Sequence, residues 1–559
     1  MALETAETTT HNNSTGQIAR STLIVMIAFG VAKLISLAQT FIIANVFGVG
    51  REWDAFVTAN RIPELIFTLI AGGALAHAFI PVFSGFLAKG DDTRAWKTAS
   101  HVINTIFAVT FLVSIVAFLL APWAVANVVA PGFDELARSQ TVELMRILLL
   151  STLIFSVSGI VMGILQSHRN FVLPALAPIM FDVGILFGVA FLMRPLGVHG
   201  IAIGAVLGAA LHLGIQIPGL IRVRARWWAE LGLNDPVLWR VIRLMLPRVA
   251  GLGVFSLNFI IMNNIASRLG TGSVSALDWG WRLMQIPETL IGTAMGTVIF
   301  PTLAALSEVN DERGKRKAMT GALRFILIAT IPSAIGLIVV GRPLISLLER
   351  GAFDASASAL VYSTLQFFTL GLVVHSLLEV VARSFYADKD TFTPLIAAMG
   401  GAAINLVLSF ALSGVARVEG YGLLNLAAAQ YPFLGLQAHP GSVGGLALAN
   451  SLGVAFEVVF LLIILRRRWH GIQESALART LFKALAASLI MALAIAGIDA
   501  VMRAVGLLDR GFAFTVIELG VKVVIGGLVF LGAAALLRME ELDMLLRLIL
   551  RRRTVEEPA

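Results

Sequence analysis

Charged and polar side chains inside long apolar runs are the residues of this sequence that could do chemistry. Lys33, Arg61 and Arg282 each lie within or beside such a run, and Gln39 follows Lys33 by six positions. A cation near the centre of a bilayer costs at least about 2.5 to 3.5 kcal/mol to bury, so we expect it to face a cavity or a partner. Three such cations predict binding of an anionic group. An ion pair that serves only helix packing is the alternative for each of them.

Two aspartates and two prolines accompany these cations at matching positions. Asp54 precedes Pro63 by nine positions, and Asp278 precedes Pro287 by nine. Asp278 and Arg282 are four positions apart and share a helix face, which predicts an ion pair. A proline frees a backbone carbonyl and lets a helix bend, and the small residues after each proline permit close approach. We therefore expect both segments to bend during a transport cycle.

Other polar residues in the apolar runs could either bind a ligand or form contacts between helices. Asn405 and Ser409 share one face of a run and Asn258 lies in another, so their oxygens are weak candidates for sodium ligands, or else hydrogen bonds between helices. Further polar residues predict helix contacts: an ion pair of Glu379 with Arg383, one contact at Asp499, and another at the pair of Glu518 and Lys522.

Enzyme chemistry has no support in the sequence. There is no phosphate-binding loop, no His-Glu-x-x-His motif and no soluble region large enough to hold a nucleotide, and the count of zero cysteines excludes disulfides and thiolate metal sites. We expect no catalytic residue, no cofactor and no resident metal.

The segment that carries Asp54 and Pro63 occurs twice in the chain. Asp54 and Asp278, and likewise Pro63 and Pro287, are 224 positions apart. Further pairs recur 220 positions apart, namely Phe133 with Phe353, Asp134 with Asp354, Arg169 with Lys389 and Pro174 with Pro394. The chain therefore contains a duplicated unit of roughly 220 residues, as many transporters do.

Composition places this unit in a membrane. Of the 559 residues, 58% are hydrophobic and only 14% are charged, with a mean hydropathy of +0.87, so a water-soluble core cannot hide the apolar surface. The net charge of +8 suits the basic cytoplasmic loops of a membrane protein better than a nucleic-acid partner.

Fourteen apolar runs are long enough to cross the hydrocarbon layer. They lie at 21–46, 60–87, 102–129, 142–166, 173–193, 200–221, 238–266, 279–305, 319–340, 359–386, 392–413, 443–465, 480–501 and 515–537. Basic residues gather in the even-numbered connections and the C-terminal tail, which predicts that both termini are cytoplasmic.

The predicted fold is an all-α polytopic membrane protein with fourteen transmembrane helices. Two pseudo-symmetric six-helix lobes surround a central cavity, and two further helices follow at the C-terminus. The expected divisions are a disordered cytosolic tail at 1–20, an N-terminal lobe at 21–221, a C-terminal lobe at 222–465, two additional helices at 466–537 and a basic amphipathic tail at 538–559.

Several strings resemble the MurJ (MviN) family of lipid II flippases. They are FGVGREWDAFVTANRIPELIFTLIAGGALAHAFIPVF from Phe47 to Phe83, APGF from Ala130 to Phe133, NFVLPALAP from Asn170 to Pro178, and WRLMQIPETLIGTAMGTVIFPTL from Trp281 to Leu303. The resemblance covers helices 1 to 12 and implies the fold of the multidrug/oligosaccharidyl-lipid/polysaccharide exporter superfamily. It also implies an activity, transfer of undecaprenyl-pyrophosphate-linked peptidoglycan precursor from the inner to the outer leaflet by alternating access, driven by membrane potential or an ion gradient.

The resemblance also assigns roles to residues. Lys33, Arg61, Arg282 and Gln39 would bind the headgroup, Asp54 and Asp278 with Pro63 and Pro287 would form the gate, and 466–537 would form a groove for the lipid tail. This sequence departs from the family at Lys33, Gln39, Thr40 and about Phe67, where the family has charged residues and here only Lys33 keeps a charge. Lysine lacks the planar fork with which arginine grips a pyrophosphate.

Three other functions are compatible with this sequence. The first is a flippase for another polyprenyl-linked oligosaccharide, and the second a drug/cation antiporter of the same fold. The third is a transport-inactive scaffold that recruits cell-wall synthesis enzymes. The expected location is the bacterial inner membrane, with a lipid-linked glycan as substrate and no nucleic-acid partner.

Overall fold

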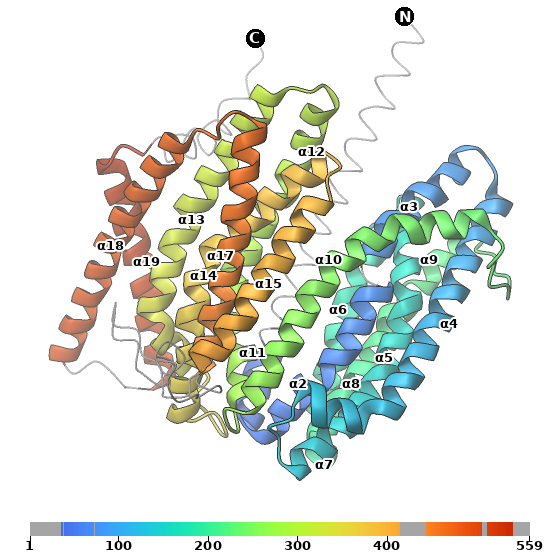
Figure 1. Cartoon of the computed structure of the whole chain (residues 1–559). Helices are drawn as coiled ribbons and strands as arrows, with labels where there is room; N and C mark the ends of the chain where they lie inside the picture. The colour runs from blue at the N-terminus through green and yellow to red at the C-terminus, as the bar shows by residue number, and fades with distance from the viewer. Residues whose placement is uncertain (1–34, 37, 72, 414–442, 506–510, 540–559) are drawn as a thin grey trace, which may run out of the picture. The chain divides into compact units, whose positions relative to one another are not determined.

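The computed structural model describes residues 35–36, 38–71, 73–413, 443–505 and 511–539 (Figure 1). Lys33, the predicted tail at 1–20 and nearly all of the predicted tail at 538–559 lie outside this part of the chain. The described residues form helices and no β-strand. They divide into two compact units, one ending at Asn264 and the other beginning at Ile265.

The first unit is built around one central helix. After an apolar helix at Ala38–Phe47, its elements are α2 (Arg51–Ile66), the π-helical segment η1 (Phe67–Ala71), α3 (Gly73–Ala88), α4 (Asp92–Ala124), η2 (Val125–Val129), α5 (Glu135–Ser167), α6 (Val172–Phe187), η3 (Gly188–Leu192), α7 (Met193–Leu196), α8 (Val198–Gly214), α9 (Ile217–Arg222) and α10 (Pro236–Ser267), whose last residues begin the second unit. The central helix is α5, which packs against α2, α3, α4 and α8, while α6 packs against α8.

The second unit repeats this arrangement. Its elements are α11 (Ser273–Glu288), η4 (Thr289–Thr293), α12 (Ala294–Glu308), α13 (Glu312–Ser346), α14 (Ala355–Ala387), α15 (Phe392–Ser413), α17 (Val443–Arg468), α18 (Glu474–Ala504) and α19 (Phe512–Leu536). Helix α14 packs against α11, α12, α13 and α17, and α15 packs against α17. These are the neighbours that the repeat assigns to the counterpart of α5, so the duplication is a structural one.

Helices α18 and α19 have no counterpart in the first unit. They pack against each other and against α13 (Figure 1). Large apolar side chains such as Leu493 and Val524 are exposed on them, as is expected of helices that face lipid. The predicted lobe boundaries at 221 and 465 remain a prediction, because the division into compact units concerns packing rather than the repeat.

Helix ends follow the repeat closely. Four aspartates accept a hydrogen bond from a backbone N–H in the first turn of the helix that each precedes, as N-caps do: Asp91 before α4, Asp134 before α5, Asp311 before α13 and Asp354 before α14. The first and third, and the second and fourth, are 220 positions apart. Arg169 and Lys389, another such pair, have left-handed φ angles of 59° and 61°.

The prediction of an all-helical polytopic membrane protein is confirmed. In the described ranges, twelve helices are long and apolar enough to span a membrane, and shorter apolar helices at Ala38–Phe47 and Ala78–Ala88 match the first two predicted spans. Four of the predicted spans contain a π-helical segment and are therefore not regular α-helices. The runs at 102–129 and 173–193 contain η2 and η3, and the other two carry the repeated Ile-Pro-Glu sequence. The run at 60–87 consists of α2, η1 and α3, and the run at 279–305 contains η4. Both contain a proline, which lacks the N–H of the regular helical bond.

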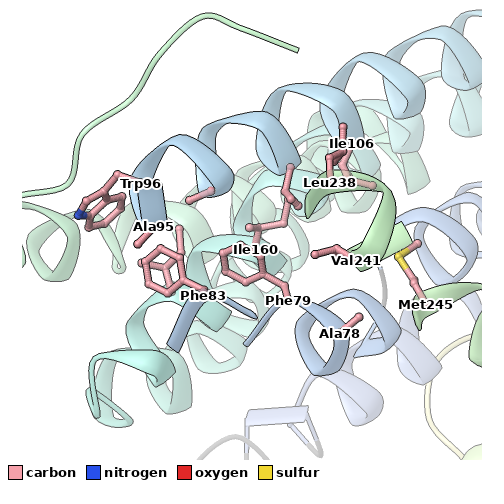
Figure 2. Packing of buried hydrophobic residues seen from close by; sticks show 13 residues of the cluster. Ala78, Phe79, Phe83, Ala95, Trp96, Ile106, Ile160, Leu238, Val241 and Met245 are labelled. Atoms are coloured by element: carbon pink, nitrogen blue, oxygen red, sulfur yellow. The ribbon is translucent and has the colours of Figure 1, made fainter. Parts of the chain in front are cut away.

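The core of the first unit includes the start of α10 (Figure 2). Phe79 and Phe83 of α3 stack with ring centroids 5.2 Å apart, and Trp96 of α4 meets Phe83 edge-on. Leu238 and Val241 of α10 are buried in the same cluster. The first part of α10 therefore packs with the first unit, although the repeat relates this helix to the start of the chain.

A loop at 223–235, which joins α9 to α10, is held on a polar face of α4. Asn104 donates hydrogen bonds to the carbonyl oxygens of Trp228 and Glu230, at 2.6 and 2.8 Å, and Thr105 donates to that of Leu231. The N–H of Trp228 donates to the Ser100 hydroxyl. These bonds fix the loop that precedes α10 without using its side chains.

Candidate functional site

The first copy of the Ile-Pro-Glu sequence lies in α2 and carries Arg61. The side chain of Arg61 is 13% exposed, and its Nη1 is 3.7 Å from Oε2 of Glu64, whose side chain is 52% exposed. Its Nε donates a long hydrogen bond of 3.5 Å to Oδ1 of Asn263, and its guanidinium lies over the ring of Phe259. A guanidinium has five N–H donors in a fixed fork. These long contacts use two of them, so Arg61 keeps donors for an anion.

Asp54 lies near the start of the same helix, α2. It is 2% exposed and lies in the first turn of α2, where a carboxylate stabilises the positive end of the helix dipole. Asn263 of α10 donates to the Thr58 hydroxyl and to the carbonyl of Val129, both at 3.1 Å. Asp54 and Arg61 therefore lie on one helix, α2. Asn263 of α10 contacts this helix at both Thr58 and Arg61.

The other predicted residues of the first unit have different surroundings. Gln39 is 6% exposed, and its Nε2 donates to the backbone carbonyl of Asp182 in α6. That bond joins the first helix to α6 and matches the packing role of polar residues in membrane helices. Lys33, the residue expected beside it, lies outside the described residues.

The second copy carries the predicted ion pair. Nε of Arg282 donates to Oδ2 of Asp278 at 2.7 Å within α11, as the spacing of four predicts. The side chain of Asp278 is 9% exposed, whereas that of Arg282 is 52% exposed. Arg282 is therefore anchored at one nitrogen by a buried carboxylate, and its side chain remains accessible.

Both prolines lie inside helices that continue into π-helical turns. Pro63 is in α2, and η1 follows at Phe67–Ala71; Pro287 is in α11, and η4 follows at Thr289–Thr293. The hydroxyl of Thr152 contacts the carbonyl of Pro63 at 3.4 Å. A π turn inserts one residue into the helical ladder and is common at functional sites. Each of these prolines is therefore followed by a π turn, which the sequence did not predict, and the bending of these helices stays a prediction.

The weak sodium candidates fall in both units. Asn258 is buried in α10 of the first unit. Asn405 and Ser409 are buried in α15 of the second, where the Ser409 hydroxyl donates to Oδ1 of Asn405 at 3.1 Å. No group of three or more His, Asp and Glu side chains that could hold a metal occurs in the described ranges.

Two further polar groups of the second unit involve helices α14, α18 and α19. The predicted pair of Glu379 with Arg383 is present in α14. Lys522 of α19 contacts both Glu518, one turn earlier, and Asp499 of α18. The sequence predicted Glu518 and Lys522 as a pair but Asp499 as a separate contact, because nothing in it shows which faces of two apolar helices meet.

These helices define a transporter fold. The chain resembles the inward-facing conformation of a multidrug resistance MATE family transporter of the MOP superfamily, with a TM-score of 0.64 and 15% identity over 80% of this chain and 99% of that one. It also resembles a lipid II flippase MurJ in an inward closed conformation, with a TM-score of 0.73 and 24% identity over 92% of this chain and 98% of that one.

Sequence relatives narrow this class to one family. The lipid II flippase MurJ of Burkholderia cenocepacia is 30% identical over 451 residues, which cover 78% of this chain and 82% of that protein. A probable lipid II flippase MurJ of Vibrio cholerae is 29% identical over 70% of this chain and 77% of its own. The family model described as lipid II flippase MurJ matches residues 43–516. The chain belongs to this family and is a multi-pass bacterial membrane protein.

Proposed function

We propose that this protein is a lipid II flippase. It would move the undecaprenyl-pyrophosphate-linked peptidoglycan precursor from the inner to the outer leaflet by alternating access. The observation that carries the proposal is the match of the flippase family model to residues 43–516, which includes every described site residue except Gln39. No chemical bond changes in this reaction, so the protein must supply a polar path for the headgroup and needs no catalytic group.

The arginines of the two Ile-Pro-Glu segments support this cargo. A pyrophosphate needs cations in a water-accessible place, because its charge cannot enter hydrocarbon. Arg61 retains unused N–H donors, and Arg282 is half-exposed. An arginine fork can bind two phosphate oxygens at once. We assign Arg61, Arg282 and Lys33 to the headgroup, with Gln39 as a polar neighbour.

The same proposal assigns the gate and the lipid tail. Asp54 and Asp278 are buried at the starts of α2 and α11, and Pro63 and Pro287 precede the π turns at which these helices can bend. Helices α18 and α19, which lie outside the repeat, would hold the polyprenyl tail. Both termini would be cytoplasmic, and reporter fusions at each end would test that orientation.

Complementation of a strain depleted of its own lipid II flippase tests the function. Wild type is compared with Lys33→Ala, Arg61→Ala and Arg282→Ala, and the amount of each protein in the membrane is measured. The matched control is Arg342→Ala, because Arg342 lies in a spanning helix, stacks on Tyr362 and is outside the proposed site. We expect wild type and the control to rescue growth and the three site variants to fail.

The alternatives predict other results. Failure of membrane-inserted wild type to rescue would contradict lipid II as the cargo and favour another polyprenyl-linked glycan. Rescue by all three site variants would contradict the proposed cationic site and favour a transport-inactive scaffold that recruits cell-wall enzymes. A drug/cation antiporter would confer drug resistance without rescue.

A further inference from the structure

Glu288, the glutamate of the second Ile-Pro-Glu segment, is a buried acid that the proposed headgroup site does not use. It ends α11 directly before η4 and is 8% exposed. Within the described ranges, its carboxylate accepts hydrogen bonds only from the hydroxyls of Thr293 and Thr289, at 3.3 and 3.5 Å. Hydrogen bonds of that length are weak. An ionised carboxylate inside a spanning segment is costly without a stronger partner.

The face of the helix that carries Glu288 packs on α14. Gly292 and Gly296 follow Glu288 at intervals of four and lie so close to α14 that a Cβ on Gly292 would be 2.8 Å from Cα of Ser376. A Cβ on Gly296 would be 3.0 Å from the carbonyl oxygen of Glu379 and would collide with the guanidinium of Arg383. Glu288 therefore belongs to the packed surface between η4 and the stretch of α14 from Ser376 to Arg383.

The charged groups around Glu288 do not neutralise it. On α14 they are Glu379 and Arg383, which act on Glu288 through space but form an ion pair with each other. On α11 itself, Arg282 is bonded to Asp278. On α13, which also touches η4, Arg324 binds Thr480 and Arg342 stacks on Tyr362. With all groups ionised, Glu288, Glu379 and Arg383 sum to one negative charge.

We propose that Glu288 binds an exchangeable proton, and that its protonation state biases the bend at η4. A neutral carboxyl group is compatible with the packed surface against α14. An ionised one favours contact with water, which the helix can provide only by moving away from α14. We expect this movement to occur at the π turn directly after Glu288, because the backbone hydrogen bonds of a π turn are already irregular. A hard metal cation would need several converging oxygens, whereas a proton needs only this carboxylate.

Infrared difference spectroscopy of the purified full-length protein tests the site directly. The protein is reconstituted in lipid, and the C=O band of a protonated carboxyl group is followed as the pH is changed. We expect a band in wild type that is lost in Glu288→Gln and kept in Glu64→Gln. Glu64 is the matched control, since it has the same place in the repeat but an exposed side chain.

Two outcomes overturn the proton site. One is a band that remains in Glu288→Gln, provided that the variant elutes as a monodisperse peak like wild type. The other is loss of the wild-type band when sodium chloride is added at constant pH, which would make the ligand a sodium ion.

A transport assay tests whether Glu288 is coupled to lipid movement. This assay rests on the proposed function, whereas the infrared measurement does not. Proteoliposomes with lipid II are given a pH gradient with sodium absent and the membrane potential clamped. We expect the gradient to change the flipping rate of wild type and to have no effect in Glu288→Gln. An equal response of both proteins overturns the coupling of Glu288 to transport. A wild type that shows the band but moves no lipid II overturns the proposed function and leaves the proton site in place.

Discussion

The two Ile-Pro-Glu segments have the same three residues and the same backbone irregularity, but their glutamates have opposite surroundings. Glu64 is half-exposed beside Arg61, whereas Glu288 is buried against α14 with two threonine hydroxyls. In both copies a proline inside the helix is followed by a π turn. The duplication has therefore kept the proline and its π turn and has changed the charge environment of the acid beside them. Charge reversal should reveal this difference most strongly.

Reversing the charge of the two glutamates should give the largest contrast. Glu288→Lys would put an ammonium group into a packed surface that already contains Arg383, and we expect it to destabilise the protein by at least about 2.5 kcal/mol. Glu64→Lys changes an exposed side chain and should cost less than about 1 kcal/mol. Thermal unfolding of the detergent-purified variants measures both. Equal losses would contradict the difference in burial.

Filling the close contact between η4 and α14 should have the next largest effect. Gly292→Ala places a Cβ 2.8 Å from Cα of Ser376, so the two helices must separate, at a cost of about 1 to 3 kcal/mol. Gly321→Ala in α13 is the matched control, because nothing lies within 4 Å of its Cβ position. That control should be neutral or slightly stabilising. Equal unfolding temperatures for both variants would show that η4 does not pack tightly.

Changing one loop residue should make the second unit resemble the first. Asp390 accepts hydrogen bonds from Thr393 and forms an ion pair of 2.5 Å with Arg468, whereas Asn170 takes its place in the first unit. Asp390→Asn removes this ion pair and should cost less than about 1 kcal/mol at neutral pH. Thermal unfolding of both proteins at pH 7 measures the loss, and an unchanged unfolding temperature would show that the ion pair contributes nothing.

The loss in Asp390→Asn should depend on pH in one direction. Burial alone would raise the pKa of Asp390, but the hydrogen bonds from Thr393 and the charge of Arg468 outweigh it and hold the pKa below its usual 3.8. The stabilisation is therefore fully present above that value and is lost as the pH falls through the lowered pKa. Wild type and variant should converge in acid. A difference that grows on acidification would contradict this account.

The smallest effects should come from one left-handed turn in each unit. Arg169 and Lys389 have left-handed φ angles, which favour glycine, and the two turns share their backbone hydrogen bonds. Arg169→Gly should raise the unfolding temperature slightly. Lys389→Gly should gain less, because it also removes the exposed ion pair of Lys389 with Glu308. A larger rise in Lys389→Gly than in Arg169→Gly would contradict this account.

The elements kept by the duplication could be predicted from sequence. Asp134 and Asp354 match at 220 positions, and both cap the central helix of their unit. Asp278 with Arg282, and Glu379 with Arg383, are one helical turn apart, so their ion pairs follow from helix geometry alone. Such features depend on residues that are close in the chain.

The environment of each intramembrane charge could not be predicted. A membrane helix is apolar on all faces, so its sequence does not show which face meets a neighbour and which meets lipid. The Ile-Pro-Glu sequence that Glu64 and Glu288 share therefore does not show which of them is buried, and nothing showed that Lys522 would contact Asp499 on another helix. The π turns depend on how a freed carbonyl finds a new donor, which is decided by packing.

The loop at 223–235 has a consequence for how this protein can change over evolutionary time. Asn104 and Thr105 bind its carbonyl oxygens, and Ser100 accepts a bond from its main chain, so most of these bonds do not depend on which side chains the loop carries. Four loop positions are exceptions: Trp227, Glu230 and Asp235 contact α4 through their side chains, and a Cβ on Gly232 would collide with His101. Substitutions at the other positions of the loop should therefore accumulate more freely than at these four, while the path of the loop stays the same.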